Sequence, residues 1–419
     1  MRVGFVGMSH LGQVYSAATA AAGVDVLLMD DDADLVDRLL TSPTVREPGL
    51  DSVWRATASQ RTCTTDFLEC RNCDLVLITR DVPTSSSGES DLTAIERLVH
   101  RLFQALAGSS IPVVVLSQVA PGTTRRWLDS YPDLSYQVET LVFGNALDRA
   151  TNPERHIIGH EHSGGSLHPM HEAWLAVFPA ERFVMSFESA EMTKIAINIY
   201  LAASVCTTNT IAELARSLGA QWDDIVPALR SDRRIGEFAY LTPGLGLSGG
   251  NIERDLASFI RISGSRGVDN DMISALLRSS AHHRQWVSRQ LRDLPLSDGS
   301  TIALLGLAYK AETASTKNSP SIAVLEEFPN YVFRVHDPSA DFETARTNVQ
   351  RCESWEDAVR GADCLLVMTP WDMYRTIDGQ LLLRLMRGRR IIDPHSVLAH
   401  ESRTLTDVDY RSLRRLGPQ

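Results

Sequence analysis

The feature that most constrains the fold is a set of short apolar runs, each followed by turn residues, at both ends of the chain. The first set is Val3–Val6, Val24–Met29, Leu75–Ile78 and Val113–Leu116, and the second is Ile302–Leu305, Tyr331–Val335, Cys364–Met368 and Arg390–Ile392. Strands that are apolar along their whole length are typical of a parallel sheet with both faces covered. We therefore expect an α/β protein with a parallel-sheet domain at each end.

The middle of the chain has a different pattern. Between about Met185 and Gly219 the alternation stops and one long helical stretch takes over, with Gly219 as a suitable C-terminal stop. A helix of this length spans about 45 Å, enough to join two domains and to offer a dimer face. The sequence predicts three domains, at residues 1–184, 185–295 and 296–419.

Length and charge exclude several classes of protein. The 419 residues suffice for two or three domains, and the net charge of −11 argues against a broad surface for nucleic acid or anionic membrane. The first residues run directly into an apolar strand, which does not fit a secretory signal. No apolar run approaches about 20 residues, so we expect no membrane span and a cytoplasmic protein.

The six cysteines do not predict a metal site. Cys70 and Cys73 form a lone C-x-x-C pair, whereas a zinc ribbon needs a second pair. Reduced structural thiols are the expected state in a cytosolic chain.

A glycine turn after the first apolar run predicts a dinucleotide site. Gly7 and Gly12 occupy the first and third glycine positions of the fingerprint, and Ser9 stands at the middle position. Such a turn lets the backbone approach a pyrophosphate, and the following helix offers its N-terminal donors. Ser9 weakens the fingerprint because its side chain lies where the backbone should touch the phosphate.

Asp30 makes the prediction more specific. It ends the second apolar run, where an acid can accept both ribose hydroxyls and repel a 2′-phosphate, so NAD is favoured over NADP. The alternative is that Asp30 opens the next helix together with Asp31 and Asp32, because negative charge suits a helix start.

Several further segments, in their order and spacing, resemble those of the UDP-glucose/GDP-mannose dehydrogenase family. They are Arg46–Leu50, Val82–Thr84 with Gly88 and Asp91–Leu92, Ser117–Thr124, Gly144–Leu147, Asn152–Arg155 with Ile157–Gly159, Glu191–Leu201, Gly306–Lys310 and Thr369–Asp372. The resemblance covers nearly the whole chain. It implies two Rossmann-like, doubly wound domains joined by a long central helix and a helical middle domain, assembled as a homodimer.

The resemblance also implies a chemistry. Family members oxidise the C6 alcohol of a nucleotide-linked sugar to an acid by two hydride transfers to NAD. A cysteine thiolate captures the intermediate aldehyde, and the resulting thioester is hydrolysed. The same resemblance implies NAD contacts at Thr84 and Gln118.

The residues for the first hydride transfer are present. Lys194 and Asn198 lie four residues apart on the middle helix and so share one face. By resemblance, this pair holds the sugar oxygen and the water that relays its proton, and Asp255 orients the water or the lysine. The alternative for Lys194 and Asn198 is a solvated helix face.

The residue for the second transfer is missing. Asn251 takes the place of the family cysteine in the segment from Gly244 to Asp255, and an amide is not a useful nucleophile. Glu139 matches the glutamate tied to thioester hydrolysis, with a salt-bridged surface acid as its alternative. Other departures are Gln118 for a threonine, Phe143 for a glutamate and Arg254 for a lysine.

The substrate residues are also inferred from the resemblance. They are Arg234, Gly246, Gly249, Arg254, Lys310 and Lys317. Lys317 replaces an arginine that usually contacts the nucleotide, and His395 stands where the family has arginine, so the nucleotide stays open. Arg234 could equally be an ordinary surface charge.

Three functions follow from these residues. The first is an NAD-dependent, single two-electron oxidation, or the reverse reduction, of a nucleotide-linked sugar or related phosphorylated metabolite without a thioester. The second is a catalytically silent or regulatory homologue that binds NAD or a nucleotide sugar. The third is the full four-electron reaction by a cysteine-independent route.

Overall fold

The computed structural model describes all residues except 84, 86–89, 341–345, 402 and 415–419. The chain forms two compact units, Met1–Ile197 and Asn198–Gln419. The boundary falls inside the long helix α8, Phe187–Ser217, which contributes to both units.

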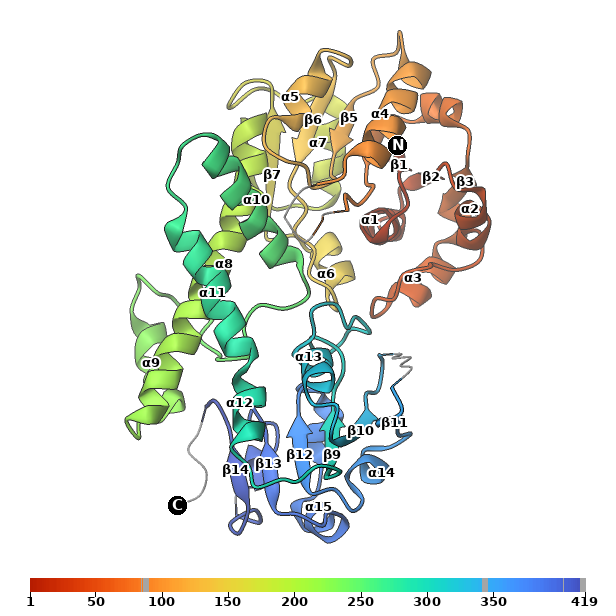
Figure 1. Cartoon of the computed structure of the whole chain (residues 1–419). Helices are drawn as coiled ribbons and strands as arrows, with labels where there is room; N and C mark the ends of the chain where they lie inside the picture. The colour runs from red at the N-terminus through yellow and green to blue at the C-terminus, as the bar shows by residue number, and fades with distance from the viewer. Residues whose placement is uncertain (84, 86–89, 341–345, 402, 415–419) are drawn as a thin grey trace. The chain divides into compact units, whose positions relative to one another are not determined.

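The first unit is built on an eight-stranded sheet (Figure 1). In spatial order its strands are β3 Arg61–Thr64, β2 Asp25–Met29, β1 Arg2–Val6, β4 Leu75–Ile78, β5 Val113–Val115, β6 Leu134–Gln137, β7 Arg155–His160 and β8 Glu181–Ser186. The first six strands in this order are parallel, and β7 pairs with β6 in the antiparallel direction. The order reverses between β1 and β4, which is where doubly wound sheets bind ligands.

Helices cover both faces of this sheet. They are α1 His10–Ala21, α2 Ala33–Leu39, α3 Leu50–Ala56, α4 Thr93–Leu106, α5 Thr123–Leu128, α6 Ala146–Thr151 and α7 Pro169–Val177, with short 3₁₀ turns at Ala58–Gln60 (η1) and Phe67–Asn72 (η2). Alternate residues of a strand pack into two separate hydrophobic cores, one on each face of the sheet. Val3 and Phe5 pack with α1, α3 and α7, whereas Val6 packs with α4, α5 and η2. Burial on both faces explains why β1 is apolar throughout.

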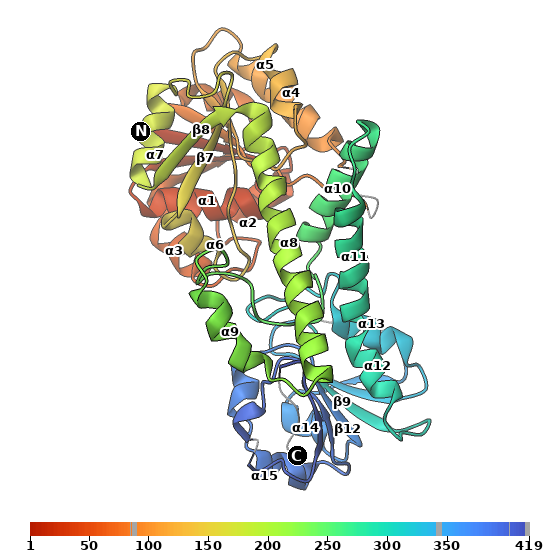
Figure 2. The same cartoon turned by 90° about the vertical axis from the view of Figure 1, so that its left-hand side faces the viewer.

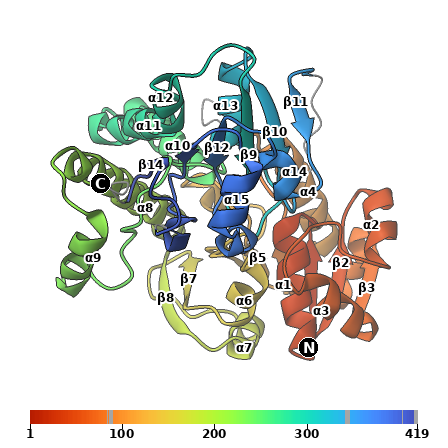
Figure 3. The same cartoon turned by 90° about the horizontal axis from the view of Figure 1, so that it is seen from below.

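The second unit contains a six-stranded parallel sheet. In spatial order its strands are β11 Val349–Arg351, β10 Val332–His336, β9 Thr301–Leu305, β12 Cys364–Val367, β13 Arg390–Ile392 and β14 Asp409–Arg411. Its helices are α12 Trp286–Arg292, α13 Pro320–Glu327, α14 Trp355–Val359 and α15 Gly379–Leu385, with 3₁₀ turns η3 Asp372–Thr376 and η4 Ala399–Glu401. Figure 3 shows this sheet between α12 and α13 on one side and α14 and α15 on the other.

A helical part completes the second unit. It consists of the C-terminal portion of α8 together with α9 Trp222–Ser231, α10 Asn251–Ser265 and α11 Asp271–Arg284. In Figure 2 the C-terminal portion of α8 runs beside α10 and α11. Ala202 and Cys206 of α8, Leu256 of α10 and Leu276 of α11 share a small apolar core, which holds the three helices together.

The predicted α/β architecture with two parallel-sheet domains and a long central helix is confirmed. All eight apolar runs form strands, and α8 ends at Ser217, just before Gly219, whose φ is +80°. Pattern analysis missed the short or polar strands β3, β11 and β14, and also β6, β7 and β8.

Helix α8 bears on the expectation that the chain has no membrane-spanning segment. It is the one helix among the described residues that is long and apolar enough to cross a membrane. Core helices of soluble proteins meet the same criterion, so this is weak evidence for a membrane segment. Glu191 and Lys194 of α8 bind partners elsewhere in the first unit, which is typical of a helix packed against protein.

Candidate functional site

The glycine turn lies where β1 and β4 diverge in the first sheet. Gly7 has φ +92°, and a Cβ atom there would lie 2.7–2.9 Å from atoms of Arg80. At Gly12 a Cβ atom would lie 2.6 Å from Thr79 Oγ1 and 2.7 Å from the Gly7 carbonyl oxygen. Both positions therefore require glycine, and the backbone is as tightly packed as a dinucleotide turn demands.

Ser9 serves the turn rather than blocking it. Its hydroxyl donates to the Thr79 carbonyl at 2.7 Å and accepts from the Asp81 amide at 3.2 Å, so it faces the loop after β4. It makes no side-chain cap on α1, and the first turn of α1 carries no acid. The start of α1 therefore suits an anion such as a pyrophosphate.

Asp30 is completely buried at the end of β2. Its Oδ2 accepts from the Met8 amide at 2.7 Å, and its Oδ1 accepts from the Asp32 amide at 3.1 Å and from Arg80 at 3.0 Å. The alternative role as a helix cap falls to Asp32, whose Oδ1 accepts from the Leu35 amide of α2 at 3.1 Å. Asp30 thus ties the glycine turn to the end of β2.

Sequence analysis missed Arg80. Its guanidinium bridges Asp30 and Asp31, the latter at 2.8 Å, and Arg97 and Arg101 also pair with Asp31. The signal available in the sequence was an arginine two residues after the apolar strand β4, at the switch point of the sheet. Because Arg80 occupies one oxygen of Asp30, a ribose hydroxyl would have to share or displace this contact.

The residues of the glycine turn otherwise fit NAD. Only glycine is tolerated at two positions, the first turn of α1 contains no acidic residue, and a carboxylate ends the second strand. Of the other predicted NAD contacts, Gln118 is partly exposed just after β5, and Thr84 lies outside the described residues.

A second residue missed in the sequence, His10, links the turn to a neighbouring loop. Its Nε2 lies 2.8 Å from Glu47 Oε1, and its ring packs on Phe143 with centroids 4.4 Å apart. Glu47 also accepts from the Gly144 amide at 2.9 Å. The segment around Glu47 therefore positions the loop that follows Phe143 against the start of α1.

Lys194 and Glu139 form an ion pair inside the first unit. Lys194 Nζ lies 2.6 Å from Glu139 Oε1 and donates to the Glu139 carbonyl at 3.1 Å. The two side chains are only 13 % and 17 % exposed. Glu139 follows β6, so α8 delivers its lysine to the carboxyl edge of the parallel strands. A freely solvated helix face at Lys194 is therefore ruled out.

Glu191, one turn before Lys194, is fully buried and positions the loop before α5. Its carboxylate accepts from the amides of Gly122 and Thr124 and from the Thr124 hydroxyl, the last at 2.7 Å. Burial raises the pKa of Glu191, and the hydrogen bonds from Thr124 and Gly122 oppose that rise. These hydrogen bonds fix the loop after Gln118 to α8.

Asn198 and Asp255 meet inside the second unit. The Asn198 amide donates to Asp255 Oδ2, and Arg254 Nε donates to Asp255 Oδ1 at 2.9 Å. Asn198 is 8 % exposed and Asp255 only 2 %. A buried carboxylate with two donors on different oxygens is fixed in orientation, and so is the amide that it holds.

Asn251 is the exposed first residue of α10. It follows Gly249 and Gly250, which have φ of +80° and +90°. A Cβ atom on Gly249 would lie 2.7 Å from the Tyr309 ring, and one on Gly250 would lie 3.0 Å from Lys317 Cε. The turn before Asn251 therefore lies against the loop that follows β9, within the same unit.

None of the six cysteines lies in this turn. Cys206 is buried in the helical core, with its thiol 3.4 Å from the Leu276 carbonyl, and burial raises its pKa. Burial likewise raises the pKa of Cys70 to about 12 and that of Cys73 to about 11. These thiols have the character of structural residues, not of nucleophiles.

The remaining substrate candidates lie in different environments. Lys310 is partly exposed, with Nζ 5.9 Å from the centre of the Tyr309 ring, near Gly249. Gly246 packs instead against α11, where a Cβ atom would lie 2.5 Å from the Ser280 carbonyl oxygen. Arg234 lies in the exposed loop after α9 and pairs with Asp232 at 2.6 Å.

His395 follows β13 in the second unit and lies near Gly244, where a Cβ atom would be 3.9 Å from its ring. Burial lowers the pKa of His395 to about 4. The ring is therefore neutral near pH 7, so it cannot replace the positive charge of the family arginine.

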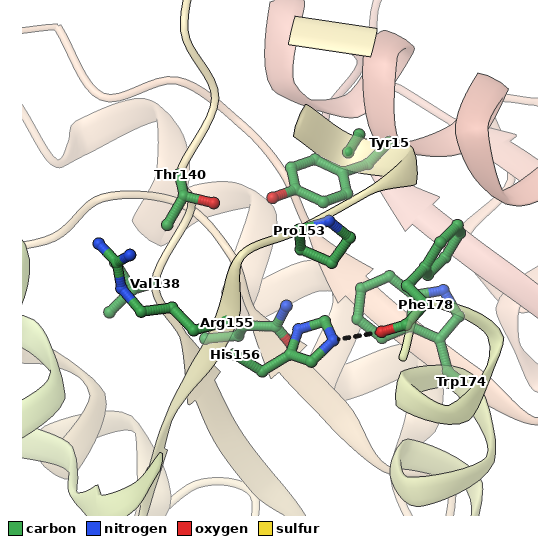
Figure 4. A pocket seen from close by; sticks show the side chains of 10 residues that line it. Tyr15, Val138, Thr140, Pro153, Arg155, His156, Trp174 and Phe178 are labelled. Carbon is green, nitrogen blue, oxygen red and sulfur yellow. Dashed lines mark hydrogen bonds between the residues drawn. The ribbon is translucent and has the colours of Figure 1, made fainter. Parts of the chain in front are cut away.

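A small cavity of about 10 Å³ lies in the first unit near Tyr15, Pro153 and His156 (Figure 4). The His156 ring contacts the Phe178 carbonyl at 2.6 Å, so His156 serves packing here. The cavity holds at most one water molecule. It does not correspond to a cofactor site.

Three family models match successive parts of the chain. Residues 1–168 match the NAD binding domain of the UDP-glucose/GDP-mannose dehydrogenase family, residues 188–281 match its central domain, and residues 303–400 match its UDP binding domain.

Whole-length relatives agree with these matches. A UDP-glucose 6-dehydrogenase from Pseudomonas aeruginosa is 28 % identical, over 95 % of this chain and 94 % of the relative. Another, from Haloferax volcanii, is 26 % identical over 99 % of this chain and 100 % of the relative. A solved UDP-glucose dehydrogenase from Pyrobaculum islandicum has a TM-score of 0.86 at 25 % identity and covers 99 % of this chain and 98 % of its own.

Proposed function

Because the chain belongs to the UDP-glucose/GDP-mannose dehydrogenase family, we propose that it catalyses one two-electron step on a nucleotide-linked sugar or related phosphorylated metabolite, without a thioester. The family consists of NAD-dependent dehydrogenases, so the chain is an oxidoreductase that acts on CH–OH groups and uses NAD. The match to the UDP binding domain points to a nucleotide-sugar substrate.

One observation carries the proposal. By the resemblance to the family motif, Asn251, the first residue of α10, takes the place of the nucleophilic cysteine, and all six cysteines lie elsewhere, five of them buried. An amide cannot capture an aldehyde as a thiohemiacetal. Without that covalent tether, the reaction is expected to stop after one hydride transfer, or to run as a reduction.

The cofactor residues act by binding and orientation. We assign the pyrophosphate to the Gly7–Gly12 turn and the start of α1, and the adenosine ribose to Asp30 once Arg80 shifts. Thr84 and Gln118 are proposed as further cofactor contacts. Bound NAD supplies the hydride acceptor.

The catalytic residues act on the sugar hydroxyl. Lys194, held by Glu139, is proposed to stabilise negative charge on the sugar oxygen, because a preorganised cation lowers the cost of that charge. Asn198 and Asp255 are proposed to hold the water that carries away the hydroxyl proton. With no thioester to hydrolyse, Glu139 becomes a positioning residue for Lys194.

The nucleotide part of the substrate is assigned to the C-terminal domain, with 1–184, 185–295 and 296–419 as the proposed domain limits. Support comes from the contacts of Gly249 with Tyr309 and of Gly250 with Lys317. Lys310, Lys317 and Arg254 supply positive charge for a diphosphate. Gly246 is proposed to shape the turn, and Arg234 to contact the sugar from an exposed loop.

The experiment that tests this function is product identification. The full-length protein is incubated with NAD and a panel of UDP- and GDP-sugars in the presence of hydroxylamine, which traps aldehydes as oximes. The proposal expects a trapped aldehyde or a ketone product detected by mass spectrometry. Release of the uronic acid with no trapped intermediate would contradict it.

A second candidate, a catalytically silent binder, is favoured by the Arg80 contact that covers Asp30. Calorimetry separates the two candidates. Stoichiometric binding of NAD or a nucleotide sugar with no turnover across the panel would support the silent binder.

We also propose that the enzyme works as a homodimer in the cytoplasm. The support is a stripe of exposed apolar side chains along the C-terminal portion of α8 and just beyond it. These are Tyr200, Ile211, Leu214 and Leu218, which are 79 %, 46 %, 59 % and 75 % exposed.

A further inference from the structure

Two adjacent histidines at the end of α11 both reach the same carboxylate on α8. His282 Nε2 lies 3.0 Å from Glu213 Oε2, and His283 Nε2 lies 3.3 Å from the same oxygen. All three residues belong to the second unit, in the part where Figure 2 shows α8 and α11 side by side. None of them takes part in the proposed chemistry.

The hydrogen bonding of His283 fixes its tautomer. Its Nδ1 lies 2.8 Å from the Ser279 carbonyl oxygen, which can only accept, so Nδ1 carries the hydrogen. Its other ring nitrogen, Nε2, lies on the side of Glu213, 3.3 Å from Oε2.

This arrangement leaves a buried ring nitrogen of His283 without a hydrogen bond to any residue that the structure describes. The His283 side chain is only 2 % exposed, and its Nε2 has no hydrogen-bond partner in the described part of the chain, although Glu213 Oε2 is close. A buried polar atom without a hydrogen bond is unfavourable, and a bound cation would supply the missing partner.

We propose that Glu213, His282 and His283 bind a divalent transition-metal ion of the Zn²⁺ type. Two imidazole nitrogens and one carboxylate oxygen are a donor set that zinc accepts. Tetrahedral ligands at about 2.0–2.1 Å from a metal lie roughly 3.3 Å apart. The three donor atoms lie within 4.8 Å of one another, and the two short separations are 3.0 and 3.3 Å.

The surroundings leave an entry path for the ion. The His282 side chain is 53 % exposed, whereas His283 forms the buried wall of the site. Three protein ligands leave a fourth position for water. The ion would clamp α11 to α8, away from Asn198 and Asp255, so its role is structural.

Arg289 is the competing cation. Its guanidinium lies 3.1 Å from Glu213 Oε1 and 3.3 Å from His282 Nε2. Its charge repels a metal ion and pairs with the carboxylate that the ion needs. Replacement by a neutral side chain should therefore strengthen metal binding.

The test is metal titration of the full-length, tag-free protein after treatment with a chelator. Wild type is expected to bind one Zn²⁺ per chain by calorimetry, and one Co²⁺ with the visible absorption of a tetrahedral site. Glu213→Gln and His282→Ala should each weaken binding at least tenfold, whereas Arg289→Gln should strengthen it.

The control is His162→Ala, which removes an exposed histidine 3.9 Å from Glu161 in the first unit and should leave binding unchanged. Circular dichroism checks that each variant is folded. His282→Ala is the variant least expected to disturb folding, because the His282 side chain is exposed. The proposal is overturned if wild type shows no stoichiometric Zn²⁺ or Co²⁺ binding. It is equally overturned if folded Glu213→Gln and His282→Ala proteins bind like wild type.

Discussion

Lys194 and Asn198 lie one helical turn apart on α8, yet each is held by a different carboxylate. Glu139 pairs with the lysine, and Asp255 accepts from the amide. Both side chains are largely buried and fixed in orientation. We propose that this retained pair, in a chain that has Asn251 in place of the family cysteine, keeps one step of the chemistry and has lost the other.

The first prediction compares these positions. Lys194→Met keeps the length and packing of the side chain but removes its charge, so kcat/KM should fall by about 10²–10⁴-fold. Asn251→Ala should change kcat/KM by no more than about threefold, because the amide has no chemical role in a single hydride transfer. Steady-state NADH formation measures both. Equal losses in the two variants would contradict the assignment.

The second prediction concerns Arg80. Its guanidinium covers Asp30 and brings positive charge beside the ribose site, which partly offsets the repulsion of a 2′-phosphate. Arg80→Met should therefore raise the ratio of kcat/KM with NAD to that with NADP by about tenfold, equivalent to ~1.4 kcal/mol. Arg126→Met, at an exposed position of α5, is the matched control and should leave the ratio unchanged.

At the scale of elements, the two sheets share the same pair of hydrogen bonds at their switch points. After β1, the Met8 amide donates to Asp30 and the Thr79 hydroxyl donates to the Gly7 carbonyl at 2.7 Å. After β9, the Leu307 amide donates to Asp337 and the Thr369 hydroxyl donates to the Ala308 carbonyl at 2.7 Å. In each sheet, an acid after the neighbouring strand fixes the turn that follows the first strand.

Helix α8 is fixed to the first unit by Glu191. Removal of its charge is the third prediction. Glu191→Gln places an NH₂ donor where the carboxylate accepts from Gly122 and Thr124, and this should cost about 2–3 kcal/mol. The melting temperature of the cooperative unit should fall by roughly 4–10 °C.

Glu188→Gln is the control for this prediction. Glu188 pairs with Arg125 near the start of the same helix but is 45 % exposed, so its loss should cost less than about 1 kcal/mol. Differential scanning calorimetry compares the two variants. If Glu188→Gln proves the more damaging, the anchoring role of Glu191 is wrong.

Strong local patterns made the main elements predictable. Strands such as Leu75–Ile78 can be recognised in the sequence because they are buried on both faces and are therefore apolar throughout. Gly219 likewise marks the end of α8. Strand β3, with sequence RTCT, carries no such pattern because it lies at the sheet edge and only tertiary pairing with β2 makes it a strand. The partners of the site residues also depend on tertiary structure. Motif spacing indicated Lys194, but only the fold shows that Arg80 reaches Asp30.

At the scale of the whole molecule, the exposed stripe on α8 favours self-association. Tyr200, Ile211, Leu214 and Leu218 recur at helical spacing, and exposed apolar stripes of this kind mark interaction sites. A homodimer through this face would bury them and bring together two copies of the same helix, as isologous contacts require.

The fourth prediction tests this association. The double variant Ile211→Glu with Leu214→Glu should be monomeric by light scattering, because four buried charges in one interface are unfavourable. Leu68→Glu replaces a leucine that is 57 % exposed in the first unit, and it should leave the dimer intact. A monomeric wild type, or a double variant that stays dimeric, would exclude the α8 interface.

We propose that the amide at Asn251 limits the enzyme to one hydride transfer, and the fifth prediction counts those transfers. The measurement is the amount of NADH formed for each nucleotide sugar consumed, with NADH followed by absorbance and the sugar by chromatography. We expect one NADH for each sugar consumed in the oxidative direction. Two NADH for each acid released would contradict it.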